Sequence, residues 1–541
     1  MKKTVLSILL LSLSSASFAQ QGSGPRLVAY RDTYILLGKY NPNPPSLSDY
    51  SPALAAREGE NGRGVDNVEA EFQISGKLIA GESLFSNRDY FSIAYTQQSF
   101  WQVYNKPFSS PFRDTNYESE LIYTWRPDKF SIEQNSWLLR SASFGFSHQA
   151  NGSHDEWDRS WNRVYAQFDT SYNDWLFRFK PWIPVGPEVN NGDELTDYYG
   201  YGELTVGYLF GDNQCNHRIT AMGRNNLKSS NKGALDVRFN YCITPALSIY
   251  AKYFNGYGES MLDYNIHNQS FGLGVALNRI GDKREVMSSS SRWAFSGMSM
   301  FRDSYILPFK YNPSPAIPDL AGGVTGEQPG NTEVEFQFSF RLTFPFTLFT
   351  DSDNLSFAYT QQTFWQPYDR SVDSIRETNY EPEFFYQWNS ESEHKAKWSP
   401  EWIRFGLVHE SNGQTQTRSR SWNRVYTEFS FDADPVSIAI KPWYRIQEDE
   451  SEDDNPNIED YYGYGELTAN WKINDRHHLM FLGRNNFKKE NKGALDIRWS
   501  YGMTQNLALY LKYFNGYGES LIDYNKHNQS LGIGIGFAIN N

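Results

Sequence analysis

The sequence predicts an all-β fold made of two tandem transmembrane antiparallel β-barrels, of about twelve strands each, after a cleaved signal peptide. Three observations lead to this prediction. The second half of the 541-residue chain repeats the first. Short alternating segments recur between turn residues, without an apolar stripe of helical period. Finally, 16% of the residues are aromatic although the mean hydropathy is −0.63, which is typical of membrane strands with aromatic girdles and a polar barrel interior.

The first 19 residues have the pattern of a secretory signal peptide. Lys2 and Lys3 precede the apolar run Val5–Leu13, and small residues follow at the site that ends with Ala19. We expect cleavage after Ala19 and leave residues 1–19 out of the fold. No later stretch approaches the roughly 18 consecutive apolar residues that a transmembrane helix needs. If the exported chain enters a membrane, we therefore expect it to do so through strands.

The internal repeat covers nearly all of the remaining chain. Residues 223–277 match residues 483–537, an offset of 483 − 223 = 260. A period of this length indicates two whole domains rather than a solenoid of short repeats. The polar, serine-rich segment Asn278–Ser291 is typical of a linker. The predicted units are a signal peptide at 1–19, a first barrel at 20–277, a linker at 278–291 and a second barrel at 292–541.

Each half contains runs of alternating residues separated by turn signals such as Gly211-Asp212-Asn213 and Asn412-Gly413. At roughly 20 residues per strand and connection, one half accommodates about a dozen strands, the size of a single-chain outer-membrane barrel. Alternation alone leaves a soluble β-sandwich open, and a single large barrel closed from both halves is also conceivable. We favour two barrels because each repeat contains a complete unit.

Charge and cysteine content restrict the classes of function. A formal net charge of −13 argues against a nucleic-acid partner. The acidic run Glu448–Asp454 could bind a cation, but a solvated loop is the preferred interpretation. The two cysteines, Cys215 and Cys242, lie near the same end of two predicted neighbouring strands. A disulfide and two free thiols both remain open.

Side-chain phase places three polar residues on an apolar strand face. Because successive side chains of a strand point to opposite faces, His409 and Ser411 share one face, and Asn423 lies on the less polar face of the returning strand. In a barrel with a polar interior, that face meets lipid. The odd positions of the first strand are Ile403, Phe405, Leu407, His409 and Ser411.

A hydroxyl, an imidazole and an amide within reach of one another are the parts of a catalytic triad. Ser411 would supply the nucleophile, His409 the general base, and Asn423 the group that orients the imidazole. Burying polar groups without partners is costly, which favours a functional role for these three on a lipid-directed face. Asn423 carries no negative charge to stabilise the imidazolium, so we expect a modest hydrolase.

Four motifs occur around these residues and elsewhere in the second half. They are His409-Glu410-Ser411-Asn412-Gly413, Ser421-Trp422-Asn423-Arg424, Arg376-Glu377-Thr378-Asn379-Tyr380-Glu381-Pro382, and Gly516-Tyr517-Gly518-Glu519-Ser520 through Asp523-Tyr524-Asn525. Together they resemble the outer membrane phospholipase A family, and the resemblance spans both halves, as a tandem duplication of two full-length copies. It implies an outer-membrane barrel that is active as a calcium-dependent dimer on phospholipid acyl esters, with A1, A2 and lysophospholipase activities.

The resemblance assigns the three triad roles to Ser411, His409 and Asn423, in agreement with the side-chain phase. It also places the backbone N–H of Gly413 in an oxyanion hole, together with a water polarised by calcium.

The resemblance implies calcium ligands as well, from both barrels. Calcium, which prefers oxygen ligands, would bind the Ser419 hydroxyl and the Gln414 carbonyl of the second barrel. The third protein ligand would be a backbone carbonyl of the partner barrel, and Ser109 matches that position. The equivalent positions of the other site carry Asp158, Ser153 and Val372.

The first half departs from the family pattern at the nucleophile. His148, Asn162 and Gly152 occupy the triad and oxyanion positions, but Ala150 has no hydroxyl. We therefore expect an intramolecular dimer, in which an inactive first barrel completes the site of the second. Covalent linkage would raise the effective concentration of that partner. The alternative is a non-catalytic lipid-binding or channel barrel, against which the intact Ser411 site argues.

Overall fold

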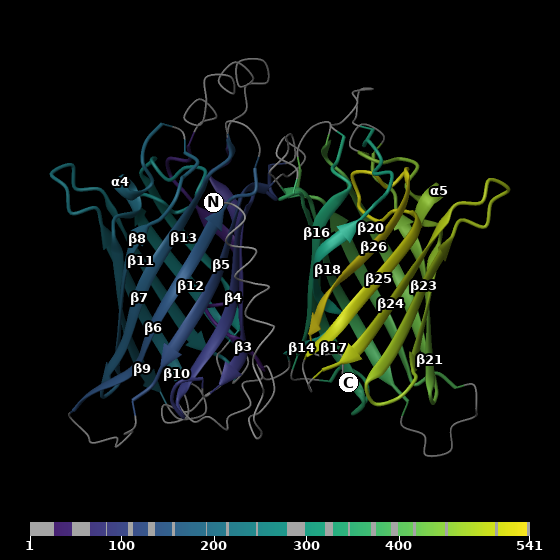
Figure 1. Ribbon diagram of the computed structural model, residues 1–541, viewed down its shortest axis with the longest axis horizontal. Helices are drawn as coiled ribbons and strands as arrows, with labels where there is room; N and C mark the ends of the chain where they lie inside the picture. Colours follow the sequence, from purple (N-terminus) through teal and green to yellow (C-terminus); the bar gives the residue numbers. More distant parts are fainter. Residues whose placement is uncertain are drawn as a thin grey trace.

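Two β-barrels stand side by side in the computed structural model (Figure 1). The structure describes residues 26–45, 65–82, 84–105, 112–127, 136–153, 157–190, 192–211, 216–244, 247–277, 298–319, 328–344, 347–368, 375–390, 399–414, 418–449, 453–503 and 507–537. The predicted signal peptide and the predicted linker at 278–291 lie outside these ranges. No helix among the described residues is long and apolar enough to cross a membrane.

The first barrel is closed by antiparallel pairing all the way round. Each strand from β2 to β13 pairs with the next, and β13 pairs back with β2. Strand β1 also pairs with β3, and so continues the line of β2 after a short break. The strands are β1 (Arg26–Ala29), β2 (Tyr34–Tyr40), β3 (Val68–Glu82), β4 (Asp89–Trp101), β5 (Phe112–Trp125), β6 (Trp137–Ala150), β7 (Ser160–Tyr172), β8 (Trp175–Pro184), β9 (Gly202–Gly211), β10 (Asn216–Asn225), β11 (Gly233–Cys242), β12 (Leu247–Gly256) and β13 (Asn268–Leu277).

The second barrel has the same topology, with β15 paired to β26 and β14 continuing the line of β15. A short helix lies at the same end of each barrel, α4 (Thr196–Tyr199) in the first and α5 (Glu459–Tyr462) in the second (Figure 1). The strands are β14 (Met298–Met300), β15 (Ser304–Tyr311), β16 (Thr332–Thr343), β17 (Asp353–Trp365), β18 (Ile375–Asn389), β19 (Trp402–Ser411), β20 (Ser421–Ala433), β21 (Val436–Ile446), β22 (Gly465–Lys472), β23 (His477–Asn485), β24 (Gly493–Gly502), β25 (Leu507–Tyr517) and β26 (His527–Phe537).

The prediction of two closed barrels is confirmed, and each barrel has twelve strands. The two alternatives that the alternation left open, a soluble sandwich and one large barrel, are wrong. The reason is local: the last strand of each repeat finds its partner in the first strand of the same repeat.

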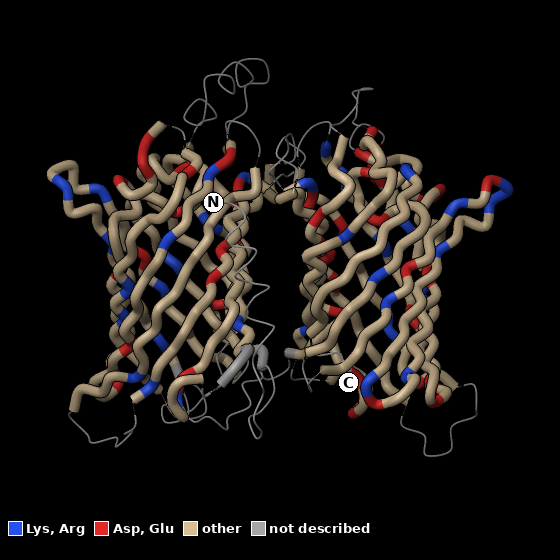
Figure 2. Tube along the Cα trace, in the orientation of Figure 1, with Lys and Arg blue, Asp and Glu red and all other residues tan. Residues whose placement is uncertain are grey.

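Charged residues occur along the full height of both barrels (Figure 2), yet many of them are buried. Strand β20 shows the pattern, with Arg424 buried and Val425 exposed. Apolar residues therefore face outward and polar residues face inward, as the sequence phase predicted.

Ion pairs hold the interior of each barrel. In the second barrel Lys310 Nζ lies 2.9 Å from Glu333, 3.1 Å from Glu335 and 2.9 Å from Glu519. Lys39 occupies the same position in the first barrel, with Glu69 at 3.0 Å. A buried charge needs such partners, and these networks provide them across several strands of each barrel.

The barrels meet through strands β3, β4 and β5 of the first and β16, β17 and β18 of the second (Figure 1). The ring of Phe72 lies 6.2 Å from that of Tyr359, and the ring of Tyr95 lies 6.1 Å from that of Phe336. These pairs exchange equivalent residues, since 336 − 72 = 264 and 359 − 95 = 264. Contacts that swap in this way are the mark of a two-fold, isologous interface.

Candidate active site

The hairpin of β19 and β20 brings His409 and Asn423 together on the outer face of the second barrel. The two residues are directly opposite each other in the strand register. His409 Nδ1 lies 2.8 Å from Asn423 Oδ1. Because the amide oxygen only accepts hydrogen bonds, Nδ1 carries the proton and Nε2 is left as the basic nitrogen. This is the tautomer that a general base needs.

Ser411 is the last residue of β19 and shares the face of His409. It lies opposite Ser421 in the register, one ladder step beyond the pair of Glu410 and Trp422. Within the described part of the chain Ser411 Oγ makes no hydrogen bond, so its contact with His409 is not preformed. Apolar side chains continue the same outer face, because Phe405 and Leu407 are both more than half exposed.

Gly413 follows in the turn after β19 and is covered by the first barrel. Its φ of 63° is in the left-handed region. A Cβ added here would lie 2.3 Å from Cδ2 of Phe112, a residue of β5. The Phe112 ring also packs on Tyr380, with ring centroids 4.8 Å apart. Only glycine fits this turn, and a side chain of the other barrel closes it.

A second aromatic residue of the first barrel reaches the site. The Trp101 ring, at the end of β4, stacks on the His409 ring with centroids 6.5 Å apart and an interplanar angle of 25°. The Tyr117 and Tyr380 hydroxyls join the two barrels beside it, 3.1 Å apart. The site is therefore built from both repeats.

Part of the acidic run after β21 folds back onto the site, so the interpretation of this run as a solvated loop is wrong for Glu448, Asp453 and Asp454, whereas Asp449 is exposed. Asn423 Nδ2 donates to Glu448 Oε1 at 2.8 Å. Ser419 Oγ donates to the Asp454 carboxylate. Arg445 of β21 pairs with Asp453 at 2.7 Å. The predicted residue Ser419 thus lies beside a carboxylate that the sequence pattern did not connect with it, whereas the Gln414 side chain accepts from Arg418 Nε at 2.7 Å.

The position of Glu448 beside Asn423 could have been predicted from the sequence. Asn423 pairs with Ile446 at the end of β21, and Glu448 comes two residues later. A carboxylate just beyond the strand that neighbours a proposed triad residue is a signal that strand register alone could have provided.

The first barrel keeps the same geometry without a nucleophile. His148 Nδ1 lies 2.9 Å from Asn162 Oδ1. Ala150 lies opposite Ser160, as Ser411 lies opposite Ser421. Gly152 has a φ of 64°, and a Cβ added to it would lie 2.7 Å from Cδ1 of Ile375.

Not all the predicted residues can be placed. Ser109 and Val372 lie outside the described residues, as does Cys215. Asp158 and Ser153 are described and lie in the turn between β6 and β7. Cys242 is disulfide-bonded.

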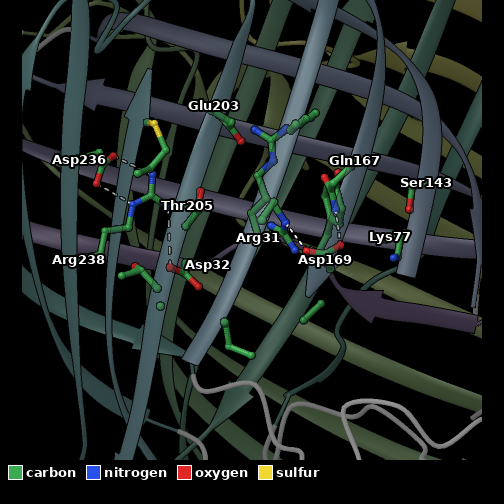
Figure 3. Close-up of a pocket in the computed structure, with 18 of the residues that line it drawn as sticks. Arg31, Asp32, Lys77, Ser143, Gln167, Asp169, Glu203, Thr205, Asp236 and Arg238 are labelled. Carbon is green, nitrogen blue, oxygen red and sulfur yellow. Dashed lines mark hydrogen bonds and ion pairs between the residues drawn. The ribbon is translucent and has the colours of Figure 1, made fainter. Parts of the chain in front are cut away.

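The cavity in Figure 3 is separate from this site. It has a volume of about 610 Å³ and lies inside the first barrel, where Arg31, Lys77 and Ser143 are among its lining residues (Figure 3). The corresponding interior of the second barrel holds a cavity of only about 100 Å³. At the position of Ser143 the second barrel carries Arg404 (404 − 143 = 261), which stacks on Trp402 at 3.8 Å. His409 and Asn423 point out of the barrel and line neither cavity.

Comparison with known proteins shows which family both repeats match. The profile of the Phospholipase A1 family matches residues 15–277 and again residues 282–537. The chain belongs to the phospholipase A1 family. This phospholipase A1 family member is thus a tandem duplication, with one family unit in each barrel.

Individual relatives each match about half of this chain. Phospholipase A1 of Escherichia coli K12 is 33% identical over 266 residues, which are 49% of this chain and 86% of the relative. Phospholipase A1 of Proteus vulgaris is 32% identical over 267 residues, again 49% of this chain and 86% of the relative. Among solved structures, outer membrane phospholipase A of Escherichia coli is 31% identical, with a TM-score of 0.41, and covers 47% of this chain and 98% of its own.

A Salmonella typhi outer membrane phospholipase, solved as a dimer with bound calcium, is 30% identical with a TM-score of 0.42 and covers 47% of this chain and 93% of its own. Family membership and the two barrels identify the chain as an outer-membrane β-barrel protein of the phospholipase class.

Proposed function

We propose that the second barrel is a calcium-dependent phospholipase that cleaves acyl esters at its outer surface, and that the first barrel is its built-in dimer partner. The observation that carries this proposal is the hydrogen bond between His409 and Asn423, which lies on the lipid-directed face and shares that face with Ser411. The proposed substrates are A1 and A2 acyl esters of phospholipids, and lysophospholipids.

The chemistry follows from the tautomer of His409. Nε2 accepts the proton of Ser411 while Oγ attacks the acyl carbonyl carbon. The same nitrogen then protonates the departing glycerol oxygen, which leaves an acyl ester on Ser411. A water molecule repeats the sequence, releases the fatty acid and restores the hydroxyl.

Gly413 would stabilise the charge that develops on the carbonyl oxygen. Its backbone N–H follows Ser411 by two residues, in a turn whose left-handed glycine cannot be replaced without moving Phe112. Preorganised donors of this type typically lower the activation barrier by about 3–4 kcal/mol. The first barrel would therefore support the oxyanion hole through Phe112.

The residues around Ser419 are chemically suited to calcium. The described chain contains no cluster of three or more His, Cys, Asp or Glu side chains that could hold a metal ion. Hydroxyl, carbonyl and single carboxylate oxygens remain, and Ca²⁺ prefers such ligands. Ser419, Gln414 and Asp454 would hold the ion, with a carbonyl from Ser109 of the first barrel as the proposed further ligand. Bound calcium would add positive charge beside the developing oxyanion.

The outer surface next to the triad, on the same two strands, favours an acyl substrate. Phe405, Leu407 and Val425 are exposed on the strands that carry His409 and Asn423. A fatty acyl chain lying along this face would keep its apolar contacts while its ester reaches Ser411. The embedded position of the triad thus points to a lipid ester rather than a water-soluble one.

The contacts between the barrels support the intramolecular dimer. Trp101 and Phe112 come from the first barrel, and they touch His409 and Gly413 of the second. The Ala150 copy needs no activity of its own to provide these contacts. One chain would then hold one working site and its partner at a fixed ratio.

The test is hydrolysis of phospholipid micelles by the full chain and its Ser411→Ala variant, with and without calcium. We expect the variant to lose at least about a thousandfold in kcat. Ser421→Ala, which alters the opposite residue of the same hairpin, should keep most activity. A sulfonyl fluoride should label the native chain at Ser411. No labelling and no calcium-dependent hydrolysis would instead support the scaffold or channel alternative.

A further inference from the structure

Asn423 uses both ends of its amide at the site. Its Oδ1 accepts from His409 Nδ1 at 2.8 Å, and its Nδ2 donates to Glu448 Oε1 at 2.8 Å. The three side chains form a continuous chain of hydrogen bonds that runs from the acidic segment after β21 to the imidazole.

The carboxylate decides which way the amide points. An ionised carboxylate only accepts hydrogen bonds, so it requires the NH₂ group of Asn423 on its side. The amide oxygen is then turned toward the imidazole, and Nδ1 of His409 must be the donor. Glu448 therefore fixes the His409 tautomer through Asn423.

The carboxylate also supplies the charge that an asparagine lacks. In a triad with an acidic third member, that charge stabilises the imidazolium formed during attack. A carboxylate one amide away polarises the amide and strengthens the bond that Oδ1 makes. The site therefore has a negative charge behind its neutral third member.

We propose that Glu448 is a positioning residue of the reaction, which holds Asn423 and stabilises the charged form of His409. This inference rests on the proposed function, because it assigns Glu448 a role in the Ser411 reaction. Glu448 acts through Asn423 and does not contact the substrate.

The first barrel provides an internal comparison. Arg424 pairs with Arg445, and its equivalent Arg163 pairs with Pro184, so the offset here is 445 − 184 = 261. The equivalent of Glu448 is then residue 448 − 261 = 187, which is Pro187. Proline has no side-chain acceptor. The carboxylate is thus present in the copy that keeps the nucleophile and missing from the copy that lost it.

Several charged groups surround the hydrogen-bond chain. Burial and the neighbouring Asp453 raise the pKa of Glu448, and Arg445 opposes them. Asp454 is a further acidic neighbour. On the imidazole side, Glu410 and Arg424 act on His409 electrostatically from the inward faces of β19 and β20. A pH profile therefore needs a control for the charge of the whole segment.

The experiment compares kcat, KM and the pH profile of the full-length wild type with those of Glu448→Gln, Glu448→Ala and Asp449→Asn. The change Glu448→Gln keeps an acceptor for Asn423 Nδ2 but removes the charge, whereas Glu448→Ala removes both. Asp449 is exposed, lies in the same acidic segment and serves as the charge control.

For E448A we expect kcat to fall roughly tenfold, with little change in KM. For E448Q we expect a smaller fall. Its acid limb should shift to lower pH, because loss of a negative charge lowers the pKa of the imidazole. The proposal is overturned if E448A matches the wild type, or if D449N shifts the acid limb as much as E448Q. Retained activity in Ser411→Ala would instead overturn the proposed function itself.

Discussion

Phe112 of the first barrel closes over Gly413 of the second, so closely that a Cβ on the glycine would lie 2.3 Å from its ring. The two residues are 413 − 112 = 301 positions apart in the chain. Their equivalents, Ile375 and Gly152, meet at the site that carries Ala150. The interface therefore places a ring on the turn after Ser411 and an aliphatic side chain on the turn after Ala150.

Removing this ring should weaken catalysis without removing any catalytic group. For Phe112→Ala we expect about a tenfold fall in kcat, equal to roughly 1.4 kcal/mol in the barrier. The reason is that the Gly413 turn loses the ring that holds it. Ile375→Ala is the matched control and should leave kcat nearly unchanged. Equal effects of the two variants on hydrolysis would contradict the assignment of the active turn.

A methyl group added to Gly413 or to Gly152 tests the same difference between the two sites, because it changes the turn and not the side chain that covers it. Gly413→Ala should abolish most hydrolysis, because a left-handed φ of 63° is unfavourable for alanine and Phe112 must move. Gly152 has a similar φ of 64°, and a methyl group added to it would meet Ile375 of the second barrel, beside the site that lacks the hydroxyl. We expect Gly152→Ala to cost stability and little activity. Steady-state kinetics of both variants in the same detergent measure the difference.

Calcium affinity should depend on the protonation of Asp454. Burial, followed by its acidic neighbour Asp453, raises the pKa of Asp454, although the Ser419 hydroxyl and Arg420 oppose the shift. A raised pKa means that the proton binds at a higher pH than for an ordinary aspartate, and a protonated carboxyl is a poor ligand. Calcium affinity should therefore fall early as the pH drops.

Calorimetric titration of calcium into the full chain between about pH 8 and pH 5 measures this effect. Asp454→Asn should weaken binding at neutral pH and flatten the pH dependence. Asp449→Asn, with an equal loss of charge from the same segment, should do neither. A steep pH dependence in D454N would show that another group controls binding.

Restoring the hydroxyl in the first barrel should restore only part of the activity. Ala150→Ser in a Ser411→Ala background places a nucleophile beside the intact pair of His148 and Asn162. We expect detectable labelling by a sulfonyl fluoride, with hydrolysis well below that of the native chain. Pro187 provides no carboxylate for Asn162, which is the physical reason. Activity equal to that of the native site would argue that Glu448 is dispensable.

The interior ion pairs predict a large effect on stability. Lys310→Met removes the cation that lies between Glu333, Glu335 and Glu519. Breaking a buried pair in this way costs about 3–5 kcal/mol. Urea unfolding of the full chain measures the loss. Lys488→Met, which breaks the exposed pair with Asp460, should leave the unfolding midpoint nearly unchanged.

Much of the architecture follows from short-range patterns in the sequence. The two-residue period of β19 places His409 and Ser411 on one face, and the burial pattern of the strand agrees. The repeat offset predicts two barrels because each copy contains a first and a last strand that pair with each other. The contacts of Glu448, Asp453 and Asp454 were not predicted, because charge composition does not reveal where a loop folds.

The sequence by itself determined the two barrels, the outward face of the triad residues and the loss of the hydroxyl at Ala150. These are properties of single strands and of residue identity. Only the tertiary structure decided that Glu448 bonds Asn423 and that Trp101 and Phe112 reach the second site. Such contacts join segments from a loop or from another barrel. They depend on how each barrel closes and on which of its faces the other barrel covers, and no local period encodes either.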